Sequence, residues 1–285
     1  MPESFPALAR LRRSLERIEP RREAAWAGLF ACGDERIDAA LGGGLARGRL
    51  HELFADEADA GSGAGFAALL SLRAGEGRRP ILWLRTEAAE KRAGRLHATG
   101  LGELGLDPAS LLLALLPDEA ALLRTAVDAA RCTGLGALLI ECWGVTRGLD
   151  LTSTRRLMLA AEGSGVTLLL LRIAAAPSPS AADTRWQIGA APSIALEADA
   201  PGAPMFDLEL LRRRAGAPAG PWRVEWDRDR LCFRDPSGDG LDVGDTRPGS
   251  GAAAPPGSPL PRSVLPLVAG RAAAADPAPP LRHTG

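Results

Sequence analysis

A glycine-bearing stretch at residues 55–65, ADEADAGSGAG, contains the residue types that come closest to a phosphate-binding loop. It follows a short apolar segment, RLHELFA (49–55), and precedes an apolar helical pattern at 62–76. Backbone N–H groups in a turn between a strand and a helix can surround a phosphate, and the positive end of the helix attracts its charge. The position and the glycines therefore suit a nucleotide, so the side chains decide whether one can bind.

The side chains of this stretch do not suit a nucleotide. A loop of the form GxxxxGK[ST] uses a lysine to reach the phosphates and a hydroxyl to hold Mg²⁺. The only lysine, Lys91, is too far along the chain. Losing one charge-assisted contact costs about 1.5–3 kcal/mol, and nearby carboxylates would repel the phosphates. We therefore predict that neither ATP nor Mg²⁺ binds, and that Asp56, Glu57 and Asp59 instead cap the following helix. The positions of this degenerate loop are Asp59, Gly61, Ser62, Gly63 and Gly65.

Composition excludes several other kinds of site. The net charge of −1 gives no overall field that attracts nucleic acid or a membrane. No run of 18 apolar residues occurs, and residues 1–22 lack the apolar core of a secretory signal, so we expect a cytoplasmic protein. The cysteines and histidines have no metal-ligand spacing, and we expect reduced thiols and no metal. These residues are Cys32, Cys132, Cys142, Cys232, His51, His97 and His283.

Between residues 33 and 173, short apolar runs alternate with helical patterns. Uninterrupted apolar runs are typical of strands buried on both faces, and this alternation predicts an α/β domain with a mostly parallel sheet. We expect strands at 49–55, 80–85, 110–117, 137–143 and 166–173, and helices at 62–76, 87–98, 118–134 and 151–165.

After residue 173 the pattern changes. Residues 174–183 are predicted to form a loop, and a more antiparallel continuation follows with strands at 193–198, 205–214 and 222–233 and a turn at 215–221. Residues 236–285 are rich in Pro, Gly, Ala and Ser, and cannot bury enough apolar surface to offset the entropy of ordering. We predict a disordered tail.

Three segments are candidates for contacts with partners. Residues 6–18 predict an amphipathic helix that packs either on its own core or on a partner. Three consecutive arginines form either a contact surface or a solvated strand end. The tail contains one short apolar segment that could bind a partner. The residues concerned are Leu8, Leu11, Leu15 and Ile18 of the helix, Arg212, Arg213 and Arg214, and Val264, Leu265 and Leu267 of the tail.

Five segments, taken in order, resemble the core of RecA-type recombinases. They are RIDAALGGGLARGRLHELFA (36–55), PILWLRTEAAEKR (80–92), LGLDPASLLLALLPDEAALLRTAVDAA (104–130), ALLIECWGV (137–145) and VTLLLLRIAA (166–175). The resemblance covers about residues 33–233. It implies a RecA-like core in which a twisted, mostly parallel sheet is flanked by helices and ends in antiparallel strands. The implied division is an N-terminal helix and linker (1–32), a RecA-like domain (33–235) and the tail (236–285).

The resemblance also implies roles for individual residues. Glu87 falls on the glutamate that activates water in recombinases, and Glu141 falls on the acid that helps to hold Mg²⁺. The second DNA-binding loop is shortened to about 174–189, where Arg185 and Trp186 could stack a base, although Trp186 could equally belong to the core. The chain departs from recombinases because it lacks the loop lysine and has Glu in place of the Mg²⁺-binding Asp. It also has no γ-phosphate-sensing Gln near Ile173–Ala174. We expect Glu87 and Glu141 to be relics.

This pattern of losses, together with the short N-terminal helix and the Pro-rich tail, resembles the ImuA family of the ImuA–ImuB–DnaE2 inducible-mutagenesis cassette. The resemblance implies a non-catalytic accessory protein of SOS-induced, error-prone translesion synthesis. Its implied partners are the Y-family polymerase homologue ImuB, with RecA and the DnaE2 polymerase as further candidates, and single-stranded DNA contacted weakly or indirectly. One alternative is a DNA-dependent ATPase that uses Glu87 and Glu141 with an atypical loop. Another is a SulA-like inhibitor of cell division.

Overall fold

The computed structural model describes residues 28–197, 200, 202–214 and 216–237. The predicted N-terminal helix with Leu8, Leu11, Leu15 and Ile18, and the tail with Val264, Leu265 and Leu267, lie outside the described residues. No helix within the described part is long and apolar enough to cross a membrane.

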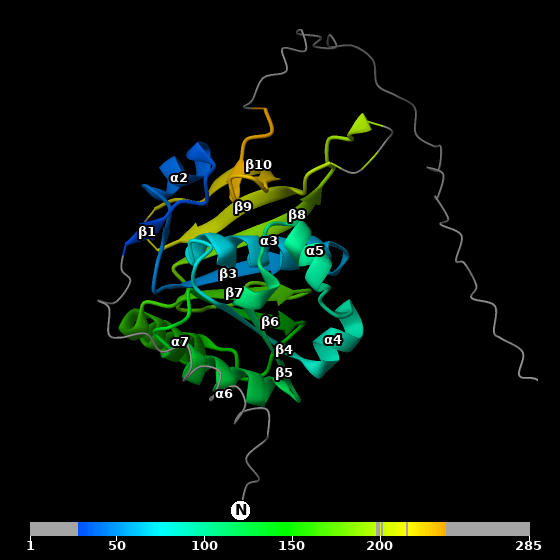
Figure 1. The fold of residues 1–285 in the computed structure, drawn as a ribbon. Coiled ribbons are helices and arrows are strands. Elements are labelled where there is room, and N and C mark those ends of the chain that lie inside the picture. Colours follow the sequence, from blue (N-terminus) through cyan, green and yellow to red (C-terminus); the bar gives the residue numbers. More distant parts are fainter. Residues whose placement is uncertain (1–27, 198–199, 201, 215, 238–285) are drawn as a thin grey trace, which may run out of the picture. The chain divides into compact units, whose positions relative to one another are not determined.

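Nine strands of the described chain form one large sheet (Figure 1). They are β3 (Leu50–Ala55), β4 (Ile81–Thr86), β5 (Leu111–Leu116), β6 (Ala137–Trp143), β7 (Thr167–Ile173), β8 (Thr184–Ala191), β9 (Met205–Arg213), β10 (Ala219–Asp227) and β11 (Cys232–Arg234). Their order is β11-β10-β9-β8-β3-β7-β6-β4-β5. The pairs from β8 to β5 are parallel, and those from β8 to β11 are antiparallel. The predicted mostly parallel α/β sheet with an antiparallel continuation is therefore confirmed.

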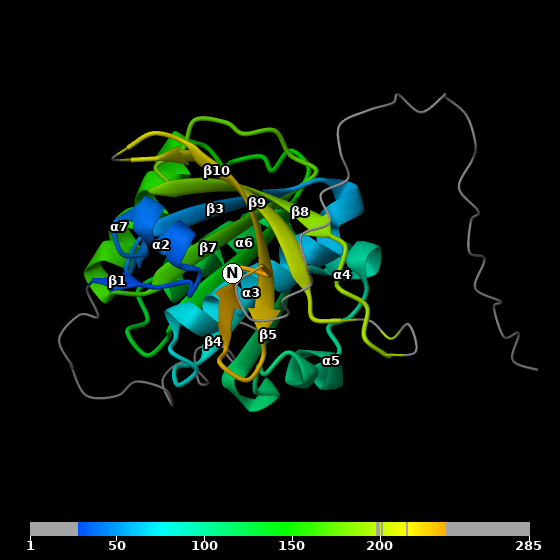
Figure 2. The same cartoon turned by 90° about the horizontal axis from the view of Figure 1, so that it is seen from above.

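Helices cover both faces of this sheet. The helix α3 (Ala60–Ala74) packs on one face, and α6 (Glu119–Ala129) and α7 (Leu151–Ser164) pack on the other (Figure 1). The smaller elements are α2 (Glu35–Leu41), α4 (Glu87–Ala93), α5 (Ala98–Glu103), the 3₁₀ turns Glu57–Asp59 and Pro108–Ser110, and the short antiparallel pair β1 (Leu29–Phe30) and β2 (Leu45–Ala46). Seen from above, α2 and β1 lie on the opposite side of the fold from α4 and α5 (Figure 2).

The sheet separates two apolar clusters. On the α3 side, Phe66 and Leu69 pack against the sheet, and on the other side Leu122 and Leu157 do the same. Every residue of β3 and β7 is buried. The apolar run Leu168–Leu171 of β7 is explained by its position in the middle of the sheet, where both faces are covered.

Two expectations for the second half of the chain are wrong. Of the strand predicted at 193–198, the described residues 193–197 do not form a strand, and Ile194 and Leu196 are 61% and 62% exposed. The strand that precedes this segment is β8 (Thr184–Ala191). Most of it falls within residues 174–189, which were expected to form a loop. Its buried residues alternate with half-buried ones, which is the pattern of a strand with one face better covered than the other.

Two predicted elements are also divided. The expected helix at 87–98 ends at Ala93, because Gly94 adopts a φ of 82° that stops it. The expected strand at 222–233 is a hairpin of β10 and β11. Elsewhere the predicted strand and helix boundaries lie within five residues of the observed ones. The largest difference is at the end of α6, which was expected at 118–134.

A buried polar chain connects β3 to β8 and β2. His51 Nδ1 lies 2.8 Å from Thr184 Oγ1, and His51 Nε2 lies 2.8 Å from the carbonyl oxygen of Ala46. Trp186 Nε1 donates to the same Thr184 oxygen, which therefore gives its own proton to His51 Nδ1. The neutral imidazole with a proton on Nε2 satisfies all of these bonds, and burial lowers the pKa of His51 below 6.5.

We expect the free energy of unfolding to fall as the pH is lowered below about 6.5, the pKa of an unfolded histidine. The unfolded chain takes up a proton there, whereas the folded chain does so only at the lower pKa of buried His51. Urea denaturation between pH 5 and pH 8 measures this effect. His51→Gln should flatten the dependence, and His97→Asn, which alters an exposed helix cap, should not. An unchanged pH dependence in His51→Gln would refute the assignment.

Candidate functional site

The junction between β3 and α3 is short and helical. After Ala55 the chain enters the 3₁₀ turn Glu57–Asp59, and α3 begins immediately at Ala60. Gly61, Ser62, Gly63 and Gly65 therefore lie inside α3. A Cβ atom added at Gly63 would lie 2.7 Å from Ala55 Cβ, so this glycine lets the helix approach the strand. The glycines that suggested a phosphate loop thus belong to a helix, and Gly63 serves its packing.

The prediction that the acidic residues of this junction cap α3 is wrong. Neither Asp56 nor Asp59 makes a side-chain capping bond. Asp59 instead accepts a hydrogen bond from the backbone N–H of Ala190 on β8, and Glu57 forms an ion pair with Arg92 on α4. The carboxylates tie the start of α3 to its neighbours, because partners outside the helix are within reach.

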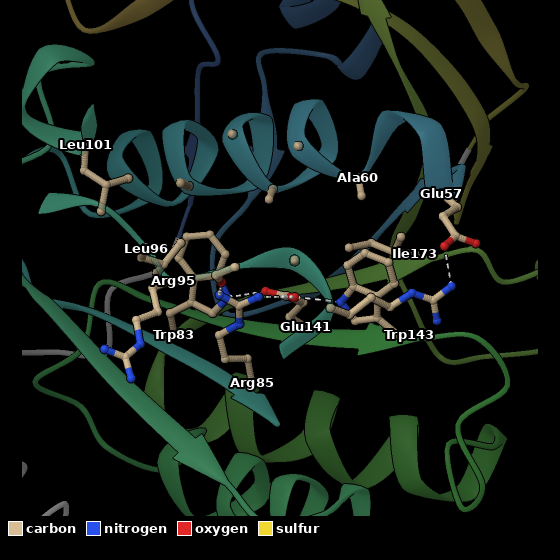
Figure 3. A pocket seen from close by; sticks show the side chains of 17 residues that line it. Glu57, Ala60, Trp83, Arg85, Arg95, Leu96, Leu101, Glu141, Trp143 and Ile173 are labelled. Atoms are coloured by element: carbon tan, nitrogen blue, oxygen red, sulfur yellow. Dashed lines mark hydrogen bonds and ion pairs between the residues drawn. The ribbon is translucent and has the colours of Figure 1, made fainter. Parts of the chain in front are cut away.

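A cavity of about 420 Å³ lies between the first turns of α3 and the carboxyl ends of β4 and β6. Small residues of α3 form one wall, and Trp83, Arg85, Glu141 and Trp143 form the opposite one. Figure 3 shows Glu141 between the two indole rings, with α3 above them. The small residues are Ala60, Gly61, Ala64, Gly65 and Ala68. This is the candidate functional site, and its geometry depends on Glu141.

The carboxylate of Glu141 receives three hydrogen bonds. Its Oε1 accepts from Arg85 Nη2 at 3.1 Å and from Trp143 Nε1 at 2.7 Å, and its Oε2 accepts from Trp83 Nε1 at 3.0 Å. The side chains of Arg85 and Glu141 are each only 2% exposed. Arg85 also donates to the carbonyl oxygens of Gly94 and Ala89 at 3.0 and 3.2 Å, while its Nε has no partner. The pair is thus a buried, extensively hydrogen-bonded ion pair.

These residues do not fit Mg²⁺ with a nucleotide. A magnesium ligand needs carboxylate oxygens that are free to face the ion, but those of Glu141 face three N–H donors. The Arg85 guanidinium would also repel a divalent cation placed near Glu141. At the junction where phosphates would lie, Glu57 and Asp59 add negative charge. Within the described residues, no group of three or more His, Cys, Asp or Glu side chains is arranged to hold a metal ion.

Glu87 lies apart from this pocket. It is the first residue of α4, where Thr86 forms the helix cap by accepting a bond from the Ala89 N–H. Its side chain is exposed and does not line the cavity. The two acidic positions that the sequence analysis paired therefore have different surroundings, with Glu141 buried and bonded and Glu87 in solvent.

Of the two alternatives for Trp186, the structure confirms the position in the core and not the stacking of a base, and Arg185 is not in a DNA-binding loop either. Both belong to β8, between β3 and β9, rather than to a loop. Trp186 is 3% exposed, so no base can stack on its ring. Arg185 Nε donates to buried Glu52 at 2.7 Å, which holds this guanidinium inside the fold.

The arginines at the end of β9 do not act as one patch. Arg213 donates to the carbonyl oxygen of Ala40 at the end of α2, and Arg214 contacts the sulfur of Met158 at 3.8 Å. Arg212 is exposed and has no ion-pair partner among the described residues. Only part of the contact surface predicted for Arg212, Arg213 and Arg214 is therefore available to a partner.

The cysteines do not supply a nucleophile. All four are free, and Cys32 and Cys142 are buried. Burial raises the pKa of Cys142 to about 12 and also raises that of Cys32, so both thiols are protonated at neutral pH.

Several residues of the pocket were not predicted from the sequence, and the ones that matter most for its geometry are Trp83, Arg85, Arg92 and Trp143. A signal was present, because Arg85 follows Trp83 by two residues on one strand and Trp143 follows Glu141 by two on another. Residues two apart share a face of a strand. Arg92 lies with its guanidinium carbon 4.7 Å from the centre of a Trp143 ring, a contact that links α4 to β6.

Two curated relatives in Caulobacter vibrioides, one from strain NA1000 / CB15N and one from strain ATCC 19089 / CIP 103742 / CB 15, are both named Protein ImuA. Each is 34% identical to the chain over 208 residues, which cover 67% of this chain and 81% of the relative. No family model matches the chain.

Among solved structures, the crystal structure of the RadB recombinase is similar, with a TM-score of 0.51 and 14% sequence identity. The similarity covers 73% of this chain and 99% of that one. At this identity the likeness shows the fold alone, and that fold is the RecA-like core implied by the sequence resemblance.

Removing the carboxylate of Glu141 should destabilise the protein strongly. In Glu141→Ala, Arg85 is left as a buried charge without its partner, and the expected loss is about 3–5 kcal/mol in the free energy of unfolding. Glu87→Ala is the matched control, and a change within about 0.5 kcal/mol is expected because its side chain is exposed. Urea denaturation measures both. Equal effects of the two substitutions would contradict the structural role of Glu141.

Proposed function

Because the chain belongs to the ImuA family, we propose that it is a non-catalytic, RecA-like accessory protein of SOS-induced, error-prone translesion DNA synthesis. It would act in DNA damage tolerance and mutagenesis through contacts with an ImuB-like, Y-family polymerase homologue. RecA and the DnaE2 polymerase are further proposed partners. The proposed location is the cytoplasm, with association with the nucleoid when DNA is damaged.

The hydrogen bonding of Glu141 carries the non-catalytic part of this proposal. At the position that resembles the Mg²⁺-binding acid of recombinases, the carboxylate accepts from Arg85, Trp83 and Trp143. Turning it towards a metal would leave Arg85 buried without its counter-charge, at a cost of about 3–5 kcal/mol. The site therefore favours the ion pair over a bound Mg²⁺.

The start of α3 supports the same proposal. A bound triphosphate needs an open turn of N–H donors and a cation, whereas this junction is a 3₁₀ turn with Glu57 and Asp59. The pocket beside it is lined by small and apolar residues and by arginines at its rim, including Arg92 and Arg95. Such a pocket suits a structural role or a protein contact better than nucleotide turnover.

The ATPase alternative has less support from the site. It requires Glu141 to leave its three donors and Glu87 to act from solvent, outside the cavity. The division-inhibitor alternative does not account for a strand order and length shared with a recombinase fold. Contact with single-stranded DNA is proposed to be weak or mediated by partners, because Trp186 is buried.

We expect the purified chain neither to bind a fluorescent ATP analogue with Mg²⁺ nor to hydrolyse ATP, with or without single-stranded DNA. The reason is that Glu141 is engaged and the loop lysine is absent. Fluorescence anisotropy and a phosphate-release assay measure the two quantities, with an active recombinase as positive control. Micromolar binding, or turnover that Glu87→Ala abolishes, would refute the non-catalytic proposal.

A second expectation concerns the partner. The full-length chain should form a complex with a purified ImuB-like protein from the same organism, and the affinity should be the same with and without ATP. Size-exclusion chromatography with light scattering measures the complex. Failure of the wild-type chain to form it would refute the adaptor function.

A further inference from the structure

A groove of about 550 Å³ lies between α6 and α7, on the face of the sheet opposite α3. The two helices lie side by side there (Figure 1), and Ser164 at the end of α7 donates to the carbonyl oxygen of Ala130 after α6 at 2.6 Å. Half-buried Leu123 and Val127 of α6 supply apolar surface to the groove, which buried Leu157 of α7 also lines. This groove is separate from the pocket that contains Glu141.

The charged side chains of the groove are mostly positive. Arg124, Arg131 and Arg156 line it, against one acidic residue, Asp128. Arg131 pairs with Asp128 at 3.4 Å. Arg124 and Arg156 are exposed, and neither has an ion-pair partner among the described residues. The groove thus presents two arginines without counter-charges, one on each helix.

The other acidic residues of α6, α7 and the segment before α7 have partners of their own. Glu119 accepts a bond from the backbone N–H of Arg147 at 3.1 Å, and Asp150 caps α7 by accepting from the Ser153 N–H at 2.8 Å. Glu162 forms an ion pair with Arg49. These carboxylates are held away from Arg124 and Arg156, so the groove keeps its positive charge.

Exposed apolar side chains continue this surface along α7. Leu151 and Leu159 are 54% and 55% exposed, and they flank Arg155 at a spacing of four residues, which places all three on one side of the helix. Leu159 also follows Arg156 by three residues, so it lies next to that arginine on the helix surface. Basic and apolar groups therefore alternate across the α7 surface.

We propose that the groove between α6 and α7 docks an acidic amphipathic helix of a partner protein. Carboxylates on such a helix would pair with Arg124 and Arg156, and its apolar residues would cover Leu123 and Val127. Helices commonly bind in this way, with apolar anchors at i, i+3, i+4 and i+7. Nucleic acid fits less well, because the groove is partly apolar and the net charge of the chain is −1. The inference rests on the proposed adaptor function, to which it gives a binding surface.

The test uses the full-length chain and a fluorescein-labelled helical peptide of about 18 residues, or five turns. Its leucines occupy the anchor positions and glutamates fill most others. Two matched peptides replace the leucines by serine or the glutamates by lysine, and a labelled single-stranded oligonucleotide is the fourth probe. The proteins are the wild type, Arg124→Glu/Arg156→Glu, and the control Arg78→Glu/Arg228→Glu, which changes the same charge at two exposed arginines elsewhere.

We expect the wild type and the control variant to bind the acidic amphipathic peptide with the same affinity in an anisotropy titration. Arg124→Glu/Arg156→Glu should weaken this binding at least tenfold, and so should either change to the peptide. Arg124→Gln/Arg156→Gln removes the two charges without reversing them and should weaken peptide binding to an intermediate degree. This variant keeps the test valid if Arg124→Glu/Arg156→Glu does not fold. No binding by the wild type, or equal binding by all variants, would overturn the inference.

Tighter binding of the oligonucleotide than of the peptide, lost in Arg124→Glu/Arg156→Glu, would also overturn it and make the groove a nucleic-acid surface. The inference about the groove and the proposed adaptor function can fail separately. If the peptide does not bind but the wild type still forms the complex with the ImuB-like protein, only the groove inference fails. If that complex does not form either, the adaptor function fails as well.

Discussion

The buried ion pair between Arg85 and Glu141 determines how side chains are arranged at the carboxyl edge of the sheet. Arg85 on β4 and Glu141 on β6 are each 2% exposed, and removing either one would leave the other as an uncompensated buried charge. Their hydrogen bonds also reach Trp83, Trp143 and the backbone of the α4 segment. One ion pair therefore joins two parallel strands, the helix that follows the first of them, and both indole rings of the pocket. We propose that the pair uses this carboxylate as a structural acceptor, so that this edge of the sheet does not bind Mg²⁺ or a nucleotide.

The start of α3 is a second consequence of close packing. Gly63 brings the helix against β3, and the 3₁₀ turn before it leaves no open loop. Glu57 and Asp59 are bound to α4 and β8, which fixes the junction from both sides. The result is a RecA-like scaffold in which Gly63 supports packing. Its opposite face carries a positively charged groove between α6 and α7. Function on such a scaffold depends on its surfaces.

The central strands could be predicted from the sequence because burial on both faces makes most of their residues apolar. The run ALLIECW was expected at 137–143, which are the bounds of β6, and β7 was placed within one residue. Strand β8 was missed because the resemblance assigned residues 174–189 to a shortened DNA-binding loop. The charge of Arg185 is accommodated in the strand because Glu52 on the adjacent strand pairs with it. The Arg85–Glu141 pair joins residues 56 positions apart, and no local pattern specifies such a partner. The acidic residues before α3 were expected to be caps for the same reason, since their true partners are distant in sequence.

The central claim is that Glu141 is held by Arg85 and two indole N–H groups and is therefore closed to Mg²⁺ and a nucleotide. The chain has six tryptophans, so the indole region of a ¹H–¹⁵N NMR spectrum is simple enough to assign by single substitutions. The most direct measurement follows the Trp83 and Trp143 Nε1–H signals during a titration with Mg²⁺ and ATP. The account predicts slow exchange of both protons with solvent and no change in their shifts up to millimolar nucleotide. Saturable shifts of both signals at lower concentration, lost in Glu141→Ala, would contradict it.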